Sequence, residues 1–190
     1  NTYGINSHHM VNKAHKMGKM VVYHGHSTYE DFRNSFTGSN IIAPFFKRYL
    51  VSLYQKADAI ITPTPYSKQL LRAYHLKQTI TPVSNGIPLD KYNQDDEKVK
   101  RFRHYFGLSE NQKVVISVGL FFERKGILDF VELAQRHPEF IFIWFGYTDL
   151  RLVPQKIRRL VKENRLPNLI FPGYITGDVI QGAYQGANLF

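Results

Sequence analysis

The chain has no cysteine among its 190 residues. This absence excludes disulfide bonds, thiolate metal sites and a cysteine nucleophile, and it is compatible with any reducing compartment. The chain also lacks the roughly 18 consecutive apolar residues that a membrane-spanning helix needs. No charged segment followed by an apolar one opens the chain, as a signal peptide would. We therefore expect a globular protein that neither spans a membrane nor carries a secretion signal.

Acidic residues are scarce, with 15 Asp and Glu against 25 Lys and Arg, which gives a formal net charge of +10 and a pI near 9.7. Such a balance indicates an acidic partner: nucleic acid, an anionic membrane surface or a phosphorylated ligand. The basic residues are scattered, and neither an aromatic-basic RNA signature nor zinc-finger spacing is present. A solvated basic surface is therefore favoured over a reader of bases, and we expect no nucleic-acid partner.

The run from Val114 to Ala134 is the most informative part of the chain. A β-branched strand at 114–118 is typical of a parallel sheet covered on both faces. Gly119 and Gly126 bracket a turn that carries Arg124 and Lys125. The following residues predict a helix with one apolar stripe, whose N-terminus would attract an anion. An ordinary strand-loop-helix unit with two solvated basic residues explains the same pattern, and the residues alone leave this choice open.

Strands and helices alternate along the whole chain. The first half predicts helices at 5–17, 41–56 and 66–74 and strands at 19–24, 58–62 and 79–83. The second half predicts a helix at about 96–106, strands at 114–118, 140–145 and 169–171, and helices at 125–137, 154–164 and 177–185. We expect an α/β fold with one domain at 1–90, a charged connector at 91–111 and a second domain at 112–190. Residues 187–190 read as the start of another strand, and both ends suggest a fragment.

Five segments in this order resemble family 4 of the retaining glycosyltransferases. They are VVYHGHSTYEDF (21–32), ADAIITPTPYSKQLL (57–71), VSNGIPLDKY (83–92), VISVGLFFERKG (115–126) and NLIFPGYI (168–175). The resemblance implies the GT-B fold of two facing Rossmann-like domains, both incomplete here. HGHSTYEDFRNSF, PTPYSK and VGLFFERKGILDF resemble a narrower group, the diacylglycerol glucosyltransferases of Gram-positive bacteria. That group transfers glucose from UDP-glucose to the 3-hydroxyl of 1,2-diacylglycerol with retention, giving an α-monoglucosyl lipid.

The resemblance implies roles for particular residues. His26 matches the catalytic-site histidine that hydrogen-bonds the donor sugar, although the bare residues favour a turn histidine. Lys125 matches the lysine that binds the donor diphosphate, in the loop that begins at Gly119. Leu120 stands where the wider family has arginine, so Arg124 is a candidate replacement for that charge. Tyr174 and Ile175 match the loop that pairs with the nucleobase, although Pro172-Gly173 also explains a simple turn.

The resemblance also bears on cofactors. No Asp-x-Asp motif is present, so we expect no metal site and no tightly bound cofactor, with stimulation by Mg²⁺ left open. The paired glutamates of the family would follow Phe190, and the isolated fragment is therefore expected to be inactive.

A lipid acceptor requires a surface that meets the membrane, and we expect a peripheral protein on the cytoplasmic face of the cell membrane. The 41–56 helix has an apolar stripe with basic residues beside it, as an interfacial helix does, but packing on a sheet explains the stripe better. The 154–164 helix is ambiguous in the same way. Two other functions stay open: a transferase using another nucleotide sugar or a polysaccharide or soluble acceptor, and a basic nucleic-acid-binding α/β module.

Overall fold

The computed structural model describes residues 6–33, 35–89 and 93–190. The chain divides into two compact units. The first consists of Asn1–Arg33 and Gly38–Ile87, and the second of Asn34–Thr37 and Pro88–Phe190. Each unit is described by itself below. The domain boundary expected after residue 90, where the connector begins, lies outside the described residues.

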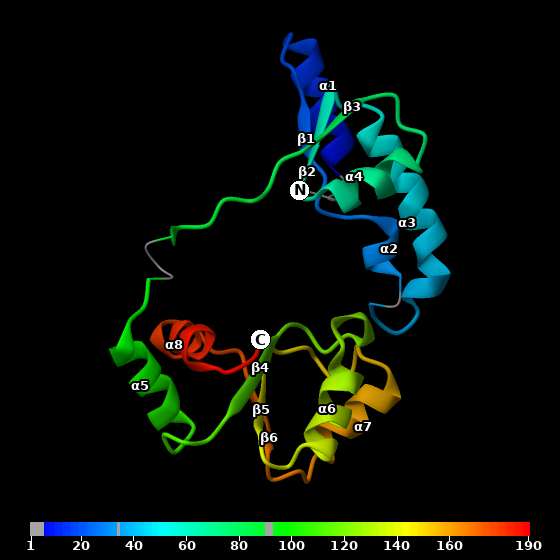
Figure 1. The fold of residues 1–190 in the computed structure, drawn as a ribbon. Helices are drawn as coiled ribbons and strands as arrows, with labels where there is room; N and C mark the ends of the chain where they lie inside the picture. Colours follow the sequence, from blue (N-terminus) through cyan, green and yellow to red (C-terminus); the bar gives the residue numbers. More distant parts are fainter. Residues whose placement is uncertain (1–5, 34, 90–92) are drawn as a thin grey trace. The chain divides into compact units, whose positions relative to one another are not determined.

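The first unit is a three-stranded parallel sheet with helices between its strands (Figure 1). Its strands pair in the order β1-β2-β3, with Tyr23 opposite Ile60 and Ile60 opposite Ile80. The elements are α1 (Ser7–Lys16), β1 (Val22–His24), α2 (Tyr29–Phe32), α3 (Ser39–Tyr54), β2 (Ala59–Thr62), α4 (Pro65–Arg72) and β3 (Thr79–Pro82).

The second unit repeats this plan with a fully covered sheet. Its strands are parallel in the order β4-β5-β6, with Val115 opposite Phe142 and Phe142 opposite Leu169. The elements are α5 (Asp96–Tyr105), β4 (Val114–Val118), a 3₁₀ turn (Glu123–Lys125), α6 (Ile127–Arg136), β5 (Ile141–Phe145), α7 (Gln155–Lys162), β6 (Leu169–Gly173) and α8 (Asp178–Gly186).

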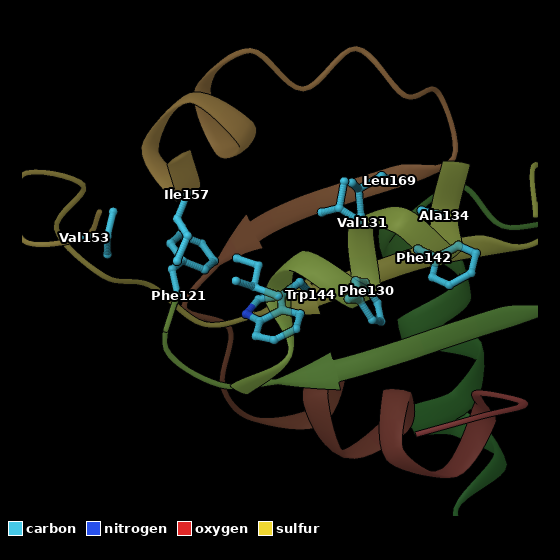
Figure 2. Packing of buried hydrophobic residues seen from close by; sticks show 10 residues of the cluster. Phe121, Phe130, Val131, Ala134, Phe142, Trp144, Val153, Ile157 and Leu169 are labelled. Carbon is cyan, nitrogen blue, oxygen red and sulfur yellow. The ribbon is translucent and has the colours of Figure 1, made fainter. Parts of the chain in front are cut away.

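Both faces of the second sheet are buried, because side chains alternate along each strand. On β5, Phe142 and Trp144 point into a core shared with α6 and α7, which Figure 2 shows. Ile143 and Phe145 point to the opposite face, into a core shared with α5 and α8. This two-sided burial is what a parallel sheet requires and confirms the expectation for the 114–118 strand.

Each predicted strand and helix is present in the structure, with ends that differ by one to three residues at most. Residues 187–190 were expected to begin a strand, and Leu189 does form a parallel bridge with Val115. One short helix was missed: α2 begins after Thr28, whose hydroxyl accepts a hydrogen bond from the Asp31 N–H at 3.2 Å. Thr-x-x-Asp is close to a capping box, so the sequence did hold this signal.

The helix expected to start at Lys125 starts instead at Ile127, which corrects the prediction. Gly126 has φ +77, in the left-handed region, so the helical path is interrupted there and Lys125 falls in the preceding 3₁₀ turn. The strand expected from residue 19 likewise begins only at Val22. The predicted apolar stripe of α6 is confirmed, because Ile127, Phe130, Val131 and Ala134 are all buried.

Packing divides α3 into two halves. Leu50, Leu53 and Tyr54 in its second half are almost completely buried. In its first half Ile42 and Phe45 are 51% and 69% exposed, so the apolar stripe expected along the whole helix packs into the core only in part. Within residues 6–33, 35–89 and 93–190, no helix combines the length and apolar character needed to cross a membrane.

Helices α5 and α8 touch through a glycine. A Cβ built at Gly182 would overlap the Lys98 carbonyl oxygen and stand 3.1 Å from Phe102 Cβ. Alanine normally favours a helix over glycine by about 1 kcal/mol. Here we expect Gly182→Ala to lower the free energy of unfolding of the second unit by about 1–3 kcal/mol, as overpacking does. Urea unfolding followed by circular dichroism measures this, and Gln181→Ala on the same helix should cost much less.

Candidate functional site

Three glycines stand side by side where the strands of the second sheet end. Gly119 follows β4, Gly146 follows β5 and Gly173 closes β6. The Gly119 N–H donates to the Phe145 carbonyl at 2.9 Å, and the Gly146 N–H donates to the Gly173 carbonyl at 2.8 Å. We call this set the glycine row. It lies at the carboxyl edge of a parallel sheet, which is where open α/β sheets bind ligands.

Close backbone approach holds the glycine row together. A Cβ at Gly146 would overlap the Gly119 carbonyl oxygen and come within 2.9 Å of the Gly119 carbonyl carbon. The φ of Gly146 is +136, a conformation that side-chain-bearing residues rarely adopt. The same Gly119 carbonyl accepts a hydrogen bond from the Trp144 indole N–H at 2.9 Å. The exit of the chain from β4 is therefore fixed by groups of β5.

Two members of the glycine row, Gly119 and Gly146, line an apolar pocket of about 240 Å³. Three of the predicted donor-site residues, Gly119, Tyr174 and Ile175, line it together. Leu120, at the position where the wider family has arginine, also lines it and is 45% exposed. The remaining lining residues are Val118, Phe145, Gly146, Tyr147 and Ile180. Flat aromatic side chains beside exposed backbone suit a planar ring with polar edges.

Lys125 stands at the edge of this pocket. Its side-chain carbons lie over Gly119, because a Cβ built on Gly119 would be 3.6 Å from Lys125 Cγ. Lys125 is exposed and makes no ion pair with the described residues. The loop that carries it is anchored at Phe121, whose N–H donates to the buried Thr148 hydroxyl at 2.8 Å. The structure thus places the side-chain stem of a lysine without an ion pair over a residue that lines the pocket, and an anion site requires such a cation.

Arg124 is engaged elsewhere. Its Nε donates to the Ser35 hydroxyl at 3.2 Å, and its guanidinium lies 5.7 Å from the centre of the Phe122 ring. Arg124 is not among the residues that line the pocket of the glycine row. Replacement by Arg124 of the charge missing at Leu120 therefore stays a prediction.

His26 lies in the first unit, directly after β1. The Gly25 N–H extends the sheet by donating to the Ile61 carbonyl at 2.7 Å. Two buried tyrosine hydroxyls then fix the loop that follows. Tyr54 donates to the Ser27 carbonyl at 3.0 Å, and Tyr74 accepts from the Tyr29 N–H at 2.6 Å. The position expected for His26, at the carboxyl edge of a parallel sheet, is the position observed.

The hydroxyl of Tyr74 also donates to Glu30 at 2.7 Å. Burial, assisted by this hydrogen bond, raises the pKa of Tyr74 above its ordinary value of 10.0, so the phenol stays protonated and keeps donating. The short helix α2, which contains Glu30, is thereby tied to residue 74, two residues beyond α4.

The His26 ring is in contact with that of His24. Nε2 of His26 lies 3.2 Å from Nδ1 of His24, so one ring donates to the other. Loss of solvation through burial, and after it the neighbouring His24, lowers the pKa of His26 below its ordinary value of 6.5. Nε2 of His24 is buried without a partner among the described residues. A neutral His26 is suited to exchanging hydrogen bonds with hydroxyl groups.

Neither Trp144 nor the Gly146 to Thr148 segment stood out in the sequence. Their role becomes visible only once β4 and β5 are known to be neighbours. One signal was available: Gly119, Gly146 and Gly173 each come at or directly after the end of a β-rich run, which marks close backbone approach. Within the described residues, no group of three or more His, Asp or Glu side chains could hold a metal ion.

Comparisons with known proteins place the chain in a family. Residues 1–91 match the model of Glycosyltransferase Family 4. Over 180 residues the chain is 49% identical to the processive diacylglycerol alpha-glucosyltransferase of Acholeplasma laidlawii, an alignment that covers 93% of this chain and 54% of the relative. The chain belongs to Glycosyltransferase Family 4.

A second family relative is the alpha-galactosylglucosyldiacylglycerol synthase of Streptococcus pneumoniae (strain ATCC BAA-255 / R6). It is 32% identical over 156 residues, covering 77% of this chain and 42% of the relative. The chain therefore spans about half the length of the curated relatives it matches. The fold also matches the crystal structure of Anabaena Alr3699/HepE in complex with UDP-glucose, with TM-score 0.74 and 18% identity. The superposition covers 100% of this chain and 50% of the HepE chain. This likeness confirms the expected GT-B fold.

Thr148 offers a test of how the donor loop is held. Thr148→Val removes the acceptor of a buried N–H, which costs about 1–3 kcal/mol when the group stays unsatisfied. We expect faster hydrogen exchange at residues 119–126, measured by mass spectrometry, while Thr148→Ser keeps the hydroxyl and stays close to wild type. Exchange in Thr148→Val as slow as in wild type would show that the loop does not depend on this bond.

His26 should titrate below its ordinary pKa in NMR spectra of the ring protons. His24→Ala should raise the His26 pKa part of the way back, because burial, the larger cause, remains. Since the folded state binds this proton less tightly than the unfolded state, His26 lowers stability as the pH falls below about 6.5. A His26 pKa at or above the ordinary value would contradict this account of the pair.

Proposed function

We propose that this chain is part of a retaining glycosyltransferase that transfers glucose from UDP-glucose to the 3-hydroxyl of 1,2-diacylglycerol, giving an α-monoglucosyl lipid. The observation that carries the proposal is the pocket of the glycine row with the Lys125 side chain at its edge, in a Family 4 chain. The names of the relatives support a diacylglycerol-based acceptor. UDP-glucose bound in a protein of the same fold supports the donor.

The donor diphosphate would be bound by Lys125. As the glycosidic bond breaks, negative charge develops on the departing UDP, and a fixed cation beside it lowers the barrier. The 3₁₀ turn and the anchored Phe121 N–H limit how far the loop carrying Lys125 can move. Because the loop is already held in place, the protein does not have to rearrange at the moment of reaction. No tightly bound cofactor is needed for this role, and Mg²⁺ stimulation is an open part of the proposal.

The uracil ring would occupy the pocket beside Tyr174 and Ile175. Leu120 and Tyr147 give that pocket apolar walls, while the backbone of Tyr174 and Ile175 would offer polar groups to the edge of the base. The neutral His26 would exchange hydrogen bonds with hydroxyl groups of the glucose. No covalent nucleophile is assigned, because leaving-group oxygen can take the acceptor proton on the face from which UDP departs.

The acceptor determines where the enzyme works. Diacylglycerol is confined to a bilayer, so we propose a peripheral protein on the cytoplasmic face of the cell membrane. The formal net charge of +10 supports attraction to an anionic leaflet, because each basic residue near such a surface contributes about 1 kcal/mol.

The full-length protein tests the proposal directly. It is incubated with labelled UDP-glucose and vesicles that contain diacylglycerol and phosphatidylglycerol, and labelled lipids are separated by chromatography. A monoglucosyl lipid whose α linkage is established by NMR is the expected product. Transfer only to a soluble acceptor, or only from another nucleotide sugar such as UDP-galactose, would replace the proposal by its alternatives.

Lys125→Ala should weaken UDP binding by about tenfold or more, because charge-assisted hydrogen bonds contribute about 1.5–3 kcal/mol. Isothermal titration of the full-length protein with UDP measures this. Lys113→Ala is the matched control, since Lys113 directly precedes β4 at the opposite edge of the same sheet. Arg124→Ala, measured in parallel, decides whether Arg124 adds to the phosphate charge. Unchanged UDP affinity in Lys125→Ala would remove the phosphate role of this residue.

A further inference from the structure

A long groove runs between α6 and α7 on the outside of the second unit. Two adjoining hollows, of about 380 and 460 Å³, share the residues Val131, Gln135 and Leu160. Aliphatic side chains line it together with four basic side chains, Arg136, Lys156, Arg159 and Arg165, and two acidic ones, Glu132 and Glu163. This groove is separate from the pocket of the glycine row, because residues 164–166 at one end of it precede β6 and so lie toward the amino edge of the sheet.

The four basic side chains of this groove outnumber its two carboxylates. Arg136 pairs with Glu132 at 2.5 Å, but Lys156, Arg159 and Arg165 have no ion pair in the part of the chain that the structure describes. Helix α5, on the other face of the sheet, differs. There Lys98, Lys100 and Arg101 each meet a carboxylate, of Asp95, Glu97 and Asp178 respectively. Excess positive charge is thus concentrated along α7.

The charges and the N-terminus of helix α7 do not favour the stability of the helix. Its first turn holds no acidic residue, Pro154 provides no side-chain cap, and Lys156 places a positive charge at the positive end of the helix dipole. Like charges three residues apart, Lys156 with Arg159 and Arg159 with Lys162, repel one another. Folding does not explain this arrangement, because an acid at residue 156 would suit the helix better. An anionic partner does explain it, since bound negative charge removes the repulsion.

We propose that the groove between α6 and α7 binds the anionic headgroups of a membrane leaflet. Its mixed chemistry fits an interface: Leu128 and Leu160 offer apolar surface, and the long stems of Lys156 and Arg159 can carry their charges to phosphates above it. The choice of a lipid leaflet over another polyanion rests on the proposed function, whose acceptor is a membrane lipid. The groove itself is a site for binding the surface and does not hold the acceptor.

Binding to vesicles tests this inference without UDP-glucose or diacylglycerol. The full-length protein is sedimented with vesicles of phosphatidylcholine, with or without phosphatidylglycerol. Each basic residue near an anionic surface strengthens binding about fivefold, so Lys156→Gln with Arg159→Gln should weaken partition onto the anionic vesicles about 25-fold. The control, Lys100→Gln with Arg101→Gln, makes the same change of net charge on α5 and should weaken partition far less.

Three outcomes would overturn the inference. They are equal losses in the two double variants, partition that does not depend on phosphatidylglycerol, and full competition by inorganic phosphate, which would indicate a site for a soluble anion. Lys156→Glu separates binding from folding: we expect a melting temperature equal to or above that of wild type, together with weaker partition. A lower melting temperature with unchanged partition would make Lys156 a structural residue.

Failure of this inference is distinguishable from failure of the proposed function. Diacylglycerol dispersed in neutral detergent offers no anionic surface to the groove. The groove variants should therefore keep wild-type transfer in detergent and lose it only on anionic vesicles. Loss of transfer in detergent as well would overturn the assignment of the groove to surface binding alone.

Discussion

The contact between the backbones of Gly119 and Gly146 is the constraint on which the second unit depends. No side chain fits at residue 146, so the chain leaving β4 can lie directly against the chain leaving β5. That approach brings the Gly119 carbonyl to the Trp144 indole and directs the following loop across the strand ends. The pocket, the place of Leu120 in its wall and the position of Lys125 all follow from it.

The first unit reaches a similar result by different means. Its loop after β1 is held by hydroxyl groups of Tyr54 and Tyr74, which come from the end of α3 and from just beyond α4. In both units the residues that would meet a ligand stand at the carboxyl edge of a parallel sheet, and neutral buried hydrogen bonds fix their backbone. Such bonds hold a loop at a modest net gain in stability, but breaking one leaves a costly unsatisfied group. The site geometry is thus resistant to small displacements.

Much of this structure could be predicted from the sequence. The strands were evident from β-branched runs, the stripe of α6 from its helical period, and the places of His26 and Lys125 from a family resemblance. What could not be predicted depends on which segments become neighbours. The close approach at Gly146 requires β4 and β5 to be adjacent, and the bond between Arg124 and Ser35 joins residues 89 positions apart. Helix α3 shows the same limit. Its apolar stripe is evident in the sequence, but the sequence does not show which part of that stripe packs against the core.

The chain contains a single tryptophan, and Trp144 is 1% exposed with its indole N–H bound to the Gly119 carbonyl. The only indole ring of the chain is therefore hydrogen-bonded to the first residue of the loop that carries Lys125. Its near-ultraviolet emission depends on the surroundings of the ring, including whether the indole N–H is donated to the Gly119 carbonyl. Movement of the loop that breaks this hydrogen bond should therefore change the wavelength or the intensity of the tryptophan fluorescence, without any label attached to the protein.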